Sequence, residues 1–126
     1  MKSWLAVAFG ASVGAWIRWG LALSLNQGGL IPLGTFLANA IGGLLMGIAL
    51  GILQVIPTLS MEWRLLMTTG FLGGLTTFST FSAEAFSLLQ KQNYGGMLLY
   101  VTSHVVVSIL LTIVGYWSVV RLHSSW

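Results

Sequence analysis

The chain has no cysteine and very little charge. Its 126 residues include two acidic and five basic side chains, so that only 6% of the residues are charged. The lack of cysteine excludes disulfide bonds, thiol catalysis and thiolate metal sites. A soluble domain carries about 25% charged residues, because its surface must be solvated. With 56% hydrophobic residues and a mean hydropathy of +0.92, the chain is predicted to be surrounded largely by lipid.

Motifs for enzymatic chemistry and for nucleic-acid binding are also missing. The sequence contains no glycine-rich phosphate loop, no nucleophile elbow and no histidine–carboxylate cluster with metal-ligand spacing. The net charge of +3 is not gathered into a lysine and arginine cluster that would follow phosphates. We therefore expect neither an enzyme nor a nucleic-acid-binding protein, and we interpret the basic residues as anchors at lipid headgroups.

Four hydrophobic stretches, separated by polar and turn-forming residues, are long enough to cross a bilayer. They cover residues of about 4–25, 33–56, 62–89 and 96–120. Since one span needs about 20 apolar residues, four spans leave no room for a separate soluble domain. The sequence therefore predicts an all-α membrane protein with four transmembrane helices, in which residues 1–126 form a single transmembrane domain.

The basic residues give almost no orientation signal. An even number of spans puts both termini on one side, together with Lys2, Arg64 and Arg121, whereas Arg18 and Lys91 lie nearer the other face. A bias of three to two is very small for the positive-inside rule. Charge leaves two alternatives open, namely a single orientation set by the termini, or insertion in both orientations with antiparallel pairing.

Glycines at steps of four predict close helix packing in the first two spans. One stripe consists of Gly10 and Gly14, and the other of glycines at positions 43, 47 and 51. Such smooth stripes let another helix approach closely. Asn39 extends the second stripe by one step, so its carboxamide should face the packed interior and offer N–H donors to a partner or to a permeating anion.

The most informative segment is Thr76–Ser82, in the middle of the third span. It contains five hydroxyl groups and two phenyl rings, and it follows the adjacent Gly73 and Gly74. Two glycines before β-branched threonines predict a break in the helix near Gly73–Thr77. Within a membrane, such a break is tolerated only where it is buried in protein or lines a cavity. A break frees backbone carbonyls that can coordinate a hard cation such as Na⁺. The positive ring edges of the two phenylalanines can contact an anion, although two core phenylalanines are the alternative.

Other polar residues lie inside the first, third and fourth spans. His104, Ser108 and Thr112 recur at steps of four, on one helix face, and they suit either an anion track or hydrogen bonds between helices. Arg18 either extends to the interface, acts as a buried structural cation, or is an electropositive element near an aqueous entrance. Glu84 is a vestibule carboxylate, an ion-coupling group or a structural, hydrogen-bonded carboxyl group.

The run from Gly70 to Phe81, Gly-Phe-Leu-Gly-Gly-Leu-Thr-Thr-Phe-Ser-Thr-Phe, resembles the signature of the CrcB/Fluc family of fluoride channels. Gly14-Ala-Trp-Ile-Arg18 and Gly34-Thr-Phe-Leu-Ala-Asn39 support the resemblance, which covers essentially the whole chain. It implies a fluoride-selective, passive channel of the bacterial inner membrane that exports fluoride from the cytoplasm. It also implies an antiparallel, dual-topology homodimer with two pores.

The resemblance further implies roles for individual residues along the fluoride pathway. Phe78 and Phe81 would form a phenylalanine box that contacts fluoride, and Asn39 would donate from its amide. The remaining residues of the polar wall and of the fourth-span track would be Ser79, Thr80, Ser82, His104, Ser108 and Thr112.

Outside the pathway, the resemblance implies a cation site and a vestibule. Backbone carbonyls of Gly73 and Thr76, from both subunits, would hold a structural Na⁺ at the two-fold axis of the dimer. Arg18 would lie near the aqueous vestibule, and Glu84 occupies a recurrent acidic position whose role stays open.

Two alternatives come from other functional classes. A small four-helix drug or cation exporter needs a carboxylate in its first span for proton coupling, whereas this chain has Arg18 there. A structural membrane subunit would not need the hydroxyl-rich segment Thr76–Ser82. Both alternatives are therefore less consistent with the sequence than a fluoride channel.

Overall fold

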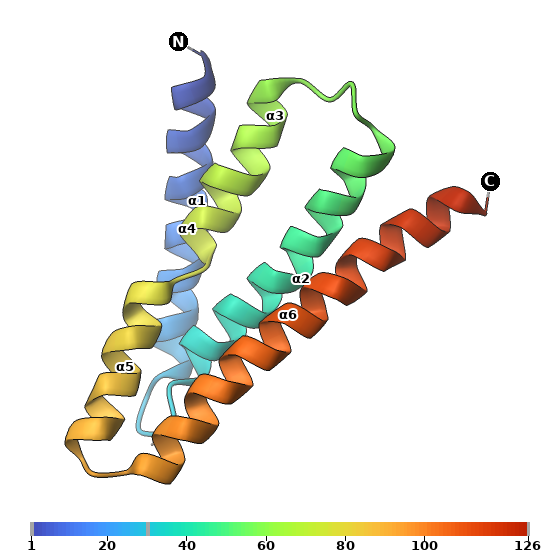
Figure 1. Ribbon diagram of the computed structural model, residues 1–126. Coiled ribbons are helices and arrows are strands. Elements are labelled where there is room, and N and C mark those ends of the chain that lie inside the picture. The colour runs from blue at the N-terminus through green and yellow to red at the C-terminus, as the bar shows by residue number, and fades with distance from the viewer. Residues whose placement is uncertain (1, 30, 126) are drawn as a thin grey trace.

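The computed structural model describes residues 2–29 and 31–125, which fold into a bundle of helices (Figure 1). Within this part of the chain, three continuous helices are long and apolar enough to cross a membrane. They are α1 (Lys2–Leu25), α2 (Leu33–Val55) and α6 (Tyr94–Ser124). Between α2 and α6 lie α3 (Met61–Leu65), the π-helix η1 (Leu66–Leu72), α4 (Gly73–Leu75) and α5 (Phe78–Gln90). The all-helical prediction is confirmed.

The predicted third span is interrupted where the sequence indicated a break. The helical path continues through both glycines and ends at Leu75. Thr76 and Thr77 then adopt extended backbone angles, with φ/ψ of −81°/153° and −148°/116°. The Thr77 side chain accepts a hydrogen bond from the backbone N–H of Thr80 and so caps α5. The first half, from α3 to α4, packs along α1, whereas α5 contacts α6 and α2 (Figure 1).

Both glycine stripes are helix-packing surfaces, as predicted. A Cβ atom added at Gly10 would lie 2.5 Å from the Leu66 carbonyl oxygen, so α1 touches η1 backbone to backbone. A Cβ atom at Gly43 would lie 2.7 Å from the Ser108 carbonyl oxygen, and one at Gly47 would collide with the carbonyl oxygen of Thr112. These contacts bring α2 against α6 along the stripe.

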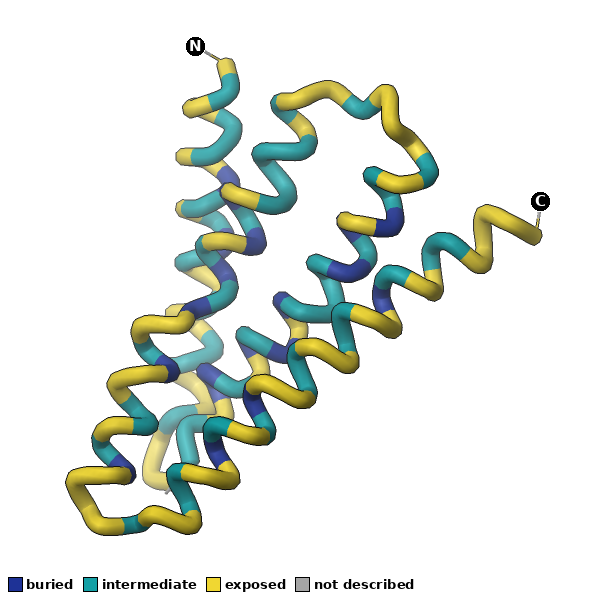
Figure 2. The backbone as a smooth tube through the Cα atoms, in the orientation of Figure 1, coloured by how far each residue is buried: buried dark blue, intermediate teal, exposed yellow. Residues whose placement is uncertain are grey.

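The outer surface is apolar, as lipid requires. Figure 2 shows buried residues where α2 faces α6 and where α1 faces η1 and α4, whereas exposed residues cover the outer sides. Trp4, Trp16 and Trp19 of α1 are 60%, 69% and 63% exposed. Figure 1 places both chain ends and the α2–α3 connection at one end of the bundle, and the α1–α2 and α5–α6 connections at the other.

Candidate functional site

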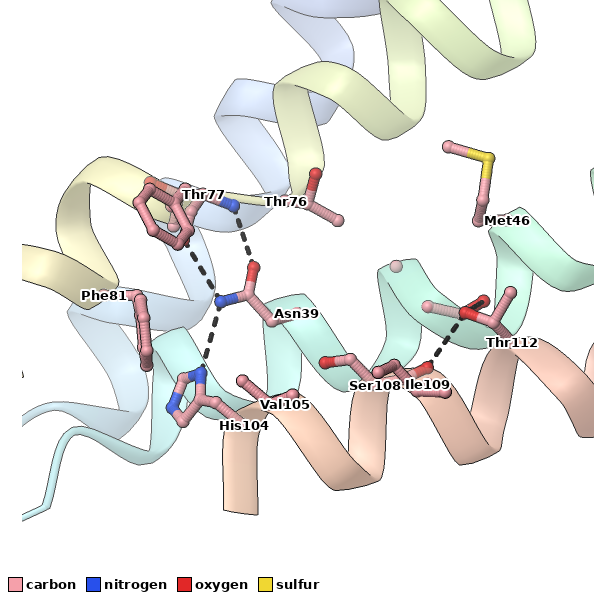
Figure 3. Close-up of a pocket in the computed structure, with 13 residues that line it drawn as sticks. Asn39, Met46, Thr76, Thr77, Phe81, His104, Val105, Ser108, Ile109 and Thr112 are labelled. Atoms are coloured by element: carbon pink, nitrogen blue, oxygen red, sulfur yellow. Dashed lines mark hydrogen bonds between the residues drawn. The ribbon is translucent and has the colours of Figure 1, made fainter. Parts of the chain in front are cut away.

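A groove of about 360 Å³ lies between α2, the helix break, α5 and α6 (Figure 3). Its walls consist of Asn39, Gly42, Gly43, Met46, Thr76, Thr77, Phe78, Phe81, His104, Val105, Ser108, Ile109 and Thr112. The groove therefore brings together residues from three separate parts of the sequence. Most of the residues predicted from helical spacing lie in it.

The Asn39 carboxamide binds the backbone of the helix break. The Thr77 N–H donates to Asn39 Oδ1 over 2.8 Å, and Asn39 Nδ2 donates to the Thr77 carbonyl oxygen over 3.2 Å (Figure 3). One side chain from α2 thus satisfies both backbone polar groups of a residue that has no helical partners for them. The predicted inward orientation of Asn39 is what makes this clamp possible.

The clamp also determines the tautomer of His104. Asn39 Nδ2 lies 3.3 Å from His104 Nδ1. Because the Thr77 N–H requires Oδ1 as its acceptor, the amide orientation is fixed, and Nδ2 can only donate. Nδ1 of the histidine is therefore the acceptor, and the proton of the neutral ring lies on Nε2.

His104 Nε2 has no hydrogen-bond partner within the described part of the chain, although the residue is only 4% exposed. The imidazole ring lies among three aromatic rings instead. Its centroid is 5.1 Å from that of Phe36, 4.9 Å from that of Phe81 and 4.3 Å from that of Tyr100. A buried N–H among aromatic rings makes only weak hydrogen bonds, so this donor is free to bind a stronger acceptor.

The two phenylalanines take different positions at the groove. Phe81 is 9% exposed and lies deep in the wall, whereas Phe78 is 79% exposed at the edge. Their ring centroids are 5.5 Å apart with an angle of 47° between the planes. In a single chain, only Phe81 is therefore enclosed.

The fourth-span residues line the groove with unequal freedom. The Thr112 hydroxyl donates toward the carbonyl oxygens of Gly43 and of Ser108, both at 2.9 Å, so its proton is committed to holding α6 against α2. Ser108 presents its hydroxyl to the groove (Figure 3). The predicted polar track thus combines a helix-packing hydroxyl with one that faces the groove.

Three of the predicted hydroxyl residues lie outside the groove lining. Ser82 donates to the carbonyl oxygen of Phe78 over 2.8 Å. Ser79 and Thr80 contact the Thr77 hydroxyl through oxygen–oxygen distances of 3.3 and 3.0 Å. These side chains organise the first turns of α5, on a different side of the helix from Phe81.

Arg18 is half-buried and binds the helix break. Its Nε donates to the carbonyl oxygen of Gly74 over 3.1 Å. Of the alternatives left by the sequence, the contact corresponds to a structural cation. The arginine ties α1 to the last turn of α4.

Glu84 is a hydrogen-bonded carboxylate between α2 and α6. Thr35 donates to its Oε1 over 2.8 Å, and the Tyr100 hydroxyl donates to its Oε2. Thr35 and Tyr100 are 2% and 1% exposed, so the network is enclosed. Sequence reasoning missed both partners, although each lies four residues before a predicted site residue, Asn39 or His104, and so extends the same helical stripe.

The carbonyl groups predicted to hold a cation lack their helical donors. The helical donor for the Gly73 carbonyl would be the Thr77 N–H, which donates to Asn39 instead. The helical donor for the Thr76 carbonyl would be the Thr80 N–H, which donates to the Thr77 hydroxyl oxygen over 3.1 Å. Two carbonyl oxygens whose helical donors bond elsewhere are suitable ligands for a hard cation such as Na⁺.

The fold and the groove define a multi-pass integral membrane protein in which polar and apolar side chains line a groove at a broken helix. Residues 5–116 match the family model described as CrcB-like protein, Camphor Resistance (CrcB). The chain is 50% identical to a protein of Aromatoleum aromaticum over 117 residues, covering 92% of this chain and 89% of the relative. It is 52% identical to a protein of Pseudomonas putida over 116 residues, 91% of each chain.

A third relative, from Pseudomonas aeruginosa, is 50% identical over 118 residues and 93% of each chain. All three relatives carry the name fluoride-specific ion channel FluC. The chain therefore belongs to the CrcB family. It is a multi-pass protein of the bacterial inner membrane and a transport protein rather than an enzyme.

Proposed function

We propose that the protein is a fluoride-selective passive channel, and that fluoride moves along the groove between α2, α5 and α6. Family membership and the names of the relatives support fluoride as the conducted ion. The observation that carries the location is the set of neutral donors in the groove lining. They are the Asn39 amide, the Ser108 hydroxyl and the Phe81 ring edge, with the His104 imidazole beside the Asn39 amide.

The donor set suits the physical problem of conducting fluoride. Fluoride is small and strongly hydrated, so only several close donors can replace its water shell. Neutral donors do this without a full positive charge that would trap the ion. HF crosses membranes and dissociates at neutral cytoplasmic pH. A membrane potential that is negative inside favours fluoride efflux by about 2.3 kcal/mol per 100 mV, so the pathway needs no coupled energy source.

Fluoride in the groove would compete with bonds inside the protein. Both N–H groups of the Asn39 amide are engaged, one by the Thr77 carbonyl and one by His104 Nδ1. An ion that binds this amide takes the place of one of these acceptors. The N-terminus of α5 lies at the same point, and the partial positive charge of a helix N-terminus favours an anion there.

The functional unit is proposed to be an antiparallel, dual-topology homodimer with four crossings per chain and two pores. The two half-helices of residues 61–90 would make the remaining crossing, which the position of both termini at one end of the bundle supports (Figure 1). The exposure of Phe78 at the groove edge supports a partner surface that completes the phenylalanine box. Carbonyls of Gly73 and Thr76 from both subunits would hold Na⁺ at the two-fold axis, where the ion would supply fixed positive charge.

The residues outside the groove lining are assigned supporting roles. Ser79, Thr80 and Ser82 lie at the start of α5 beside the exposed Phe78, so we assign them to the part of the pathway wall that the partner surface would complete. Arg18 would hold the break in place beside the vestibule, and Glu84 would fix the ends of α2 and α6 relative to α5.

Fluoride efflux from proteoliposomes tests the proposed function. Liposomes loaded with potassium fluoride and containing the protein are expected to release fluoride when valinomycin relieves the charge imbalance, as measured with a fluoride-selective electrode. Liposomes loaded with chloride are the control and are expected to retain it. Fluoride retention equal to that of protein-free liposomes would refute the channel function.

Epitope tags test the proposed dual topology. A tag at either terminus of the full chain, expressed in cells, is expected on both sides of the inner membrane in comparable amounts, because the charge bias is small. Tags found on one side only would remove the antiparallel dimer from the proposal while leaving fluoride conduction intact.

A further inference from the structure

We propose that Asn39 and Thr77 are positioning residues for the cation site. Their side-chain oxygens capture two backbone N–H groups that would otherwise bond across the break, and this leaves the carbonyls of Gly73 and Thr76 available to a cation. The inference rests on the proposed Na⁺ site and concerns the residues that create it. It assigns Asn39 a second task besides contacting fluoride.

The first captured donor is the N–H of Thr77. In a continuous α-helix, the N–H of a residue donates to the carbonyl four positions earlier, which here would be that of Gly73. It donates instead to Asn39 Oδ1 over 2.8 Å, while Asn39 Nδ2 donates back to the Thr77 carbonyl over 3.2 Å. Because this side chain belongs to α2, tertiary packing determines whether the Gly73 carbonyl is occupied.

The second captured donor is the N–H of Thr80. Its helical acceptor would be the carbonyl of Thr76, but it donates to Thr77 Oγ1 over 3.1 Å. The Thr77 hydroxyl in turn lies 3.0 Å from Thr80 Oγ1 as a donor. Thr77 is only 9% exposed, so water does not readily replace this cap. The capping threonine therefore keeps the first turn of α5 from closing onto the Thr76 carbonyl.

Neighbouring carbonyls at the break are occupied, which restricts where a cation can bind. The Leu72 carbonyl accepts from the N–H and the hydroxyl of Thr76 at 3.0 and 2.8 Å. The Gly74 carbonyl accepts from Arg18 Nε at 3.1 Å. The positions left by these bonds include Gly73 and Thr76, at the C-terminal end of α4, where the helix dipole favours positive charge.

The arrangement links the cation site to the groove through one carboxamide. Asn39 Oδ1 accepts the Thr77 N–H that would otherwise donate to the Gly73 carbonyl, while Asn39 Nδ2 faces His104 and the groove. Fluoride or Na⁺ that stabilises this orientation of the Asn39 side chain at one site therefore also favours binding of the other ion at its own site. Since such coupling is reciprocal, fluoride bound at the amide is expected to change the apparent affinity for sodium.

Sodium-dependent thermal unfolding of the purified full-length protein tests the inference without measuring conduction. The unfolding temperature is recorded while NaCl replaces N-methyl-D-glucamine chloride at constant ionic strength, and the half-saturating sodium concentration is determined. Thr77→Val removes the hydroxyl acceptor at nearly the same volume, whereas Thr77→Ser keeps it. We expect Thr77→Ser to remain within about twofold of the wild type, and Thr77→Val to need at least about tenfold more sodium.

Asn39→Ala tests the other captured N–H and is also expected to require at least about tenfold more sodium. Ser118→Ala is the matched control, because the Ser118 hydroxyl donates only within α6, to the Gly115 carbonyl at 2.7 Å, and it should behave as the wild type. Having two independent variants keeps the test decisive when one of them is not recovered folded.

The outcomes separate this inference from the proposed cation site. Wild-type protein whose unfolding temperature does not depend on sodium would remove the cation site itself, and the inference with it. A sodium-dependent wild type together with unchanged half-saturation in Thr77→Val or Asn39→Ala would overturn only the positioning role.

Discussion

Replacing His104 by phenylalanine tests whether the histidine holds Asn39 or binds fluoride directly. The histidine accepts one hydrogen bond from Asn39 Nδ2, and its own Nε2 hydrogen is buried without a partner in the described structure. Removing the acceptor leaves one Asn39 hydrogen without a partner, at a cost of about 1–3 kcal/mol. Removing the buried, unpaired Nε2 hydrogen stabilises the folded protein by a similar free energy, so the loss and the gain in stability nearly cancel.

The phenyl ring would occupy the space between Phe36, Phe81 and Tyr100 that the imidazole fills. We therefore expect His104→Phe to change the free energy of unfolding by less than about 1 kcal/mol. Fluoride that binds Asn39 would no longer have to displace His104, a bond worth about 1 kcal/mol. The apparent fluoride affinity should rise about fivefold, since about 1.4 kcal/mol corresponds to a factor of ten.

The assay is the initial rate of fluoride efflux from proteoliposomes at several internal fluoride concentrations. The variant should reach half of its maximal rate at about one-fifth of the wild-type concentration, with a maximal rate equal to or below that of the wild type. Complete loss of efflux in a variant that unfolds at the wild-type temperature would refute this reasoning, because it would make the Nε2 hydrogen a required fluoride donor.

Two further predictions concern the packing and the polar network. Gly47→Ala places a methyl group against the carbonyl oxygen of Thr112 and should cost about 1–3 kcal/mol of unfolding free energy. Gly95→Ala is the control, because no atom lies within 4 Å of its new methyl group. Equal stability of the two variants in thermal unfolding would contradict the role of the stripe. Tyr100→Phe removes one of two donors to Glu84 and should cost about 1–3 kcal/mol. In a double-mutant cycle with Glu84→Gln the losses should be less than additive, and strict additivity would show that the two side chains do not interact.

The helices could be predicted from the sequence because lipid imposes a simple hydropathy pattern, but the position of the break could be predicted only approximately. Gly73 and Gly74 lie inside helical backbone, since a glycine in a helix costs only about 1 kcal/mol. The chain opens at Thr76 and Thr77, where Asn39 from another helix binds the freed backbone groups. Such a tertiary contact has no signal in the local sequence, and neither does the π-helical register of residues 66–72.

The helical period explains why three of the hydroxyl residues lie outside the groove lining of the single chain. Successive residues in a helix are rotated by about 100°. If Phe81 faces the groove, Phe78 lies about 60° away, Ser82 about 100° and Ser79 about 160°. The phenylalanines therefore line the groove and the serines do not. The resemblance implies one polar wall for these residues, whereas the helical period separates the serines from the phenylalanines.

In the proposed channel, the break would let neutral groups attract an anion without trapping it. The α5 N-terminus faces the groove at Phe78, and the α4 C-terminus ends at Leu75. Each helix end carries about half an elementary charge, of opposite sign, so in the proposed channel fluoride and Na⁺ would each meet a partial charge of opposite sign to their own. Asn39 holds the backbone of Thr77 in the open conformation that creates both ends. If that N–H returned to the Gly73 carbonyl, the two halves would join into one helix, and neither ion would find a helix end at this depth.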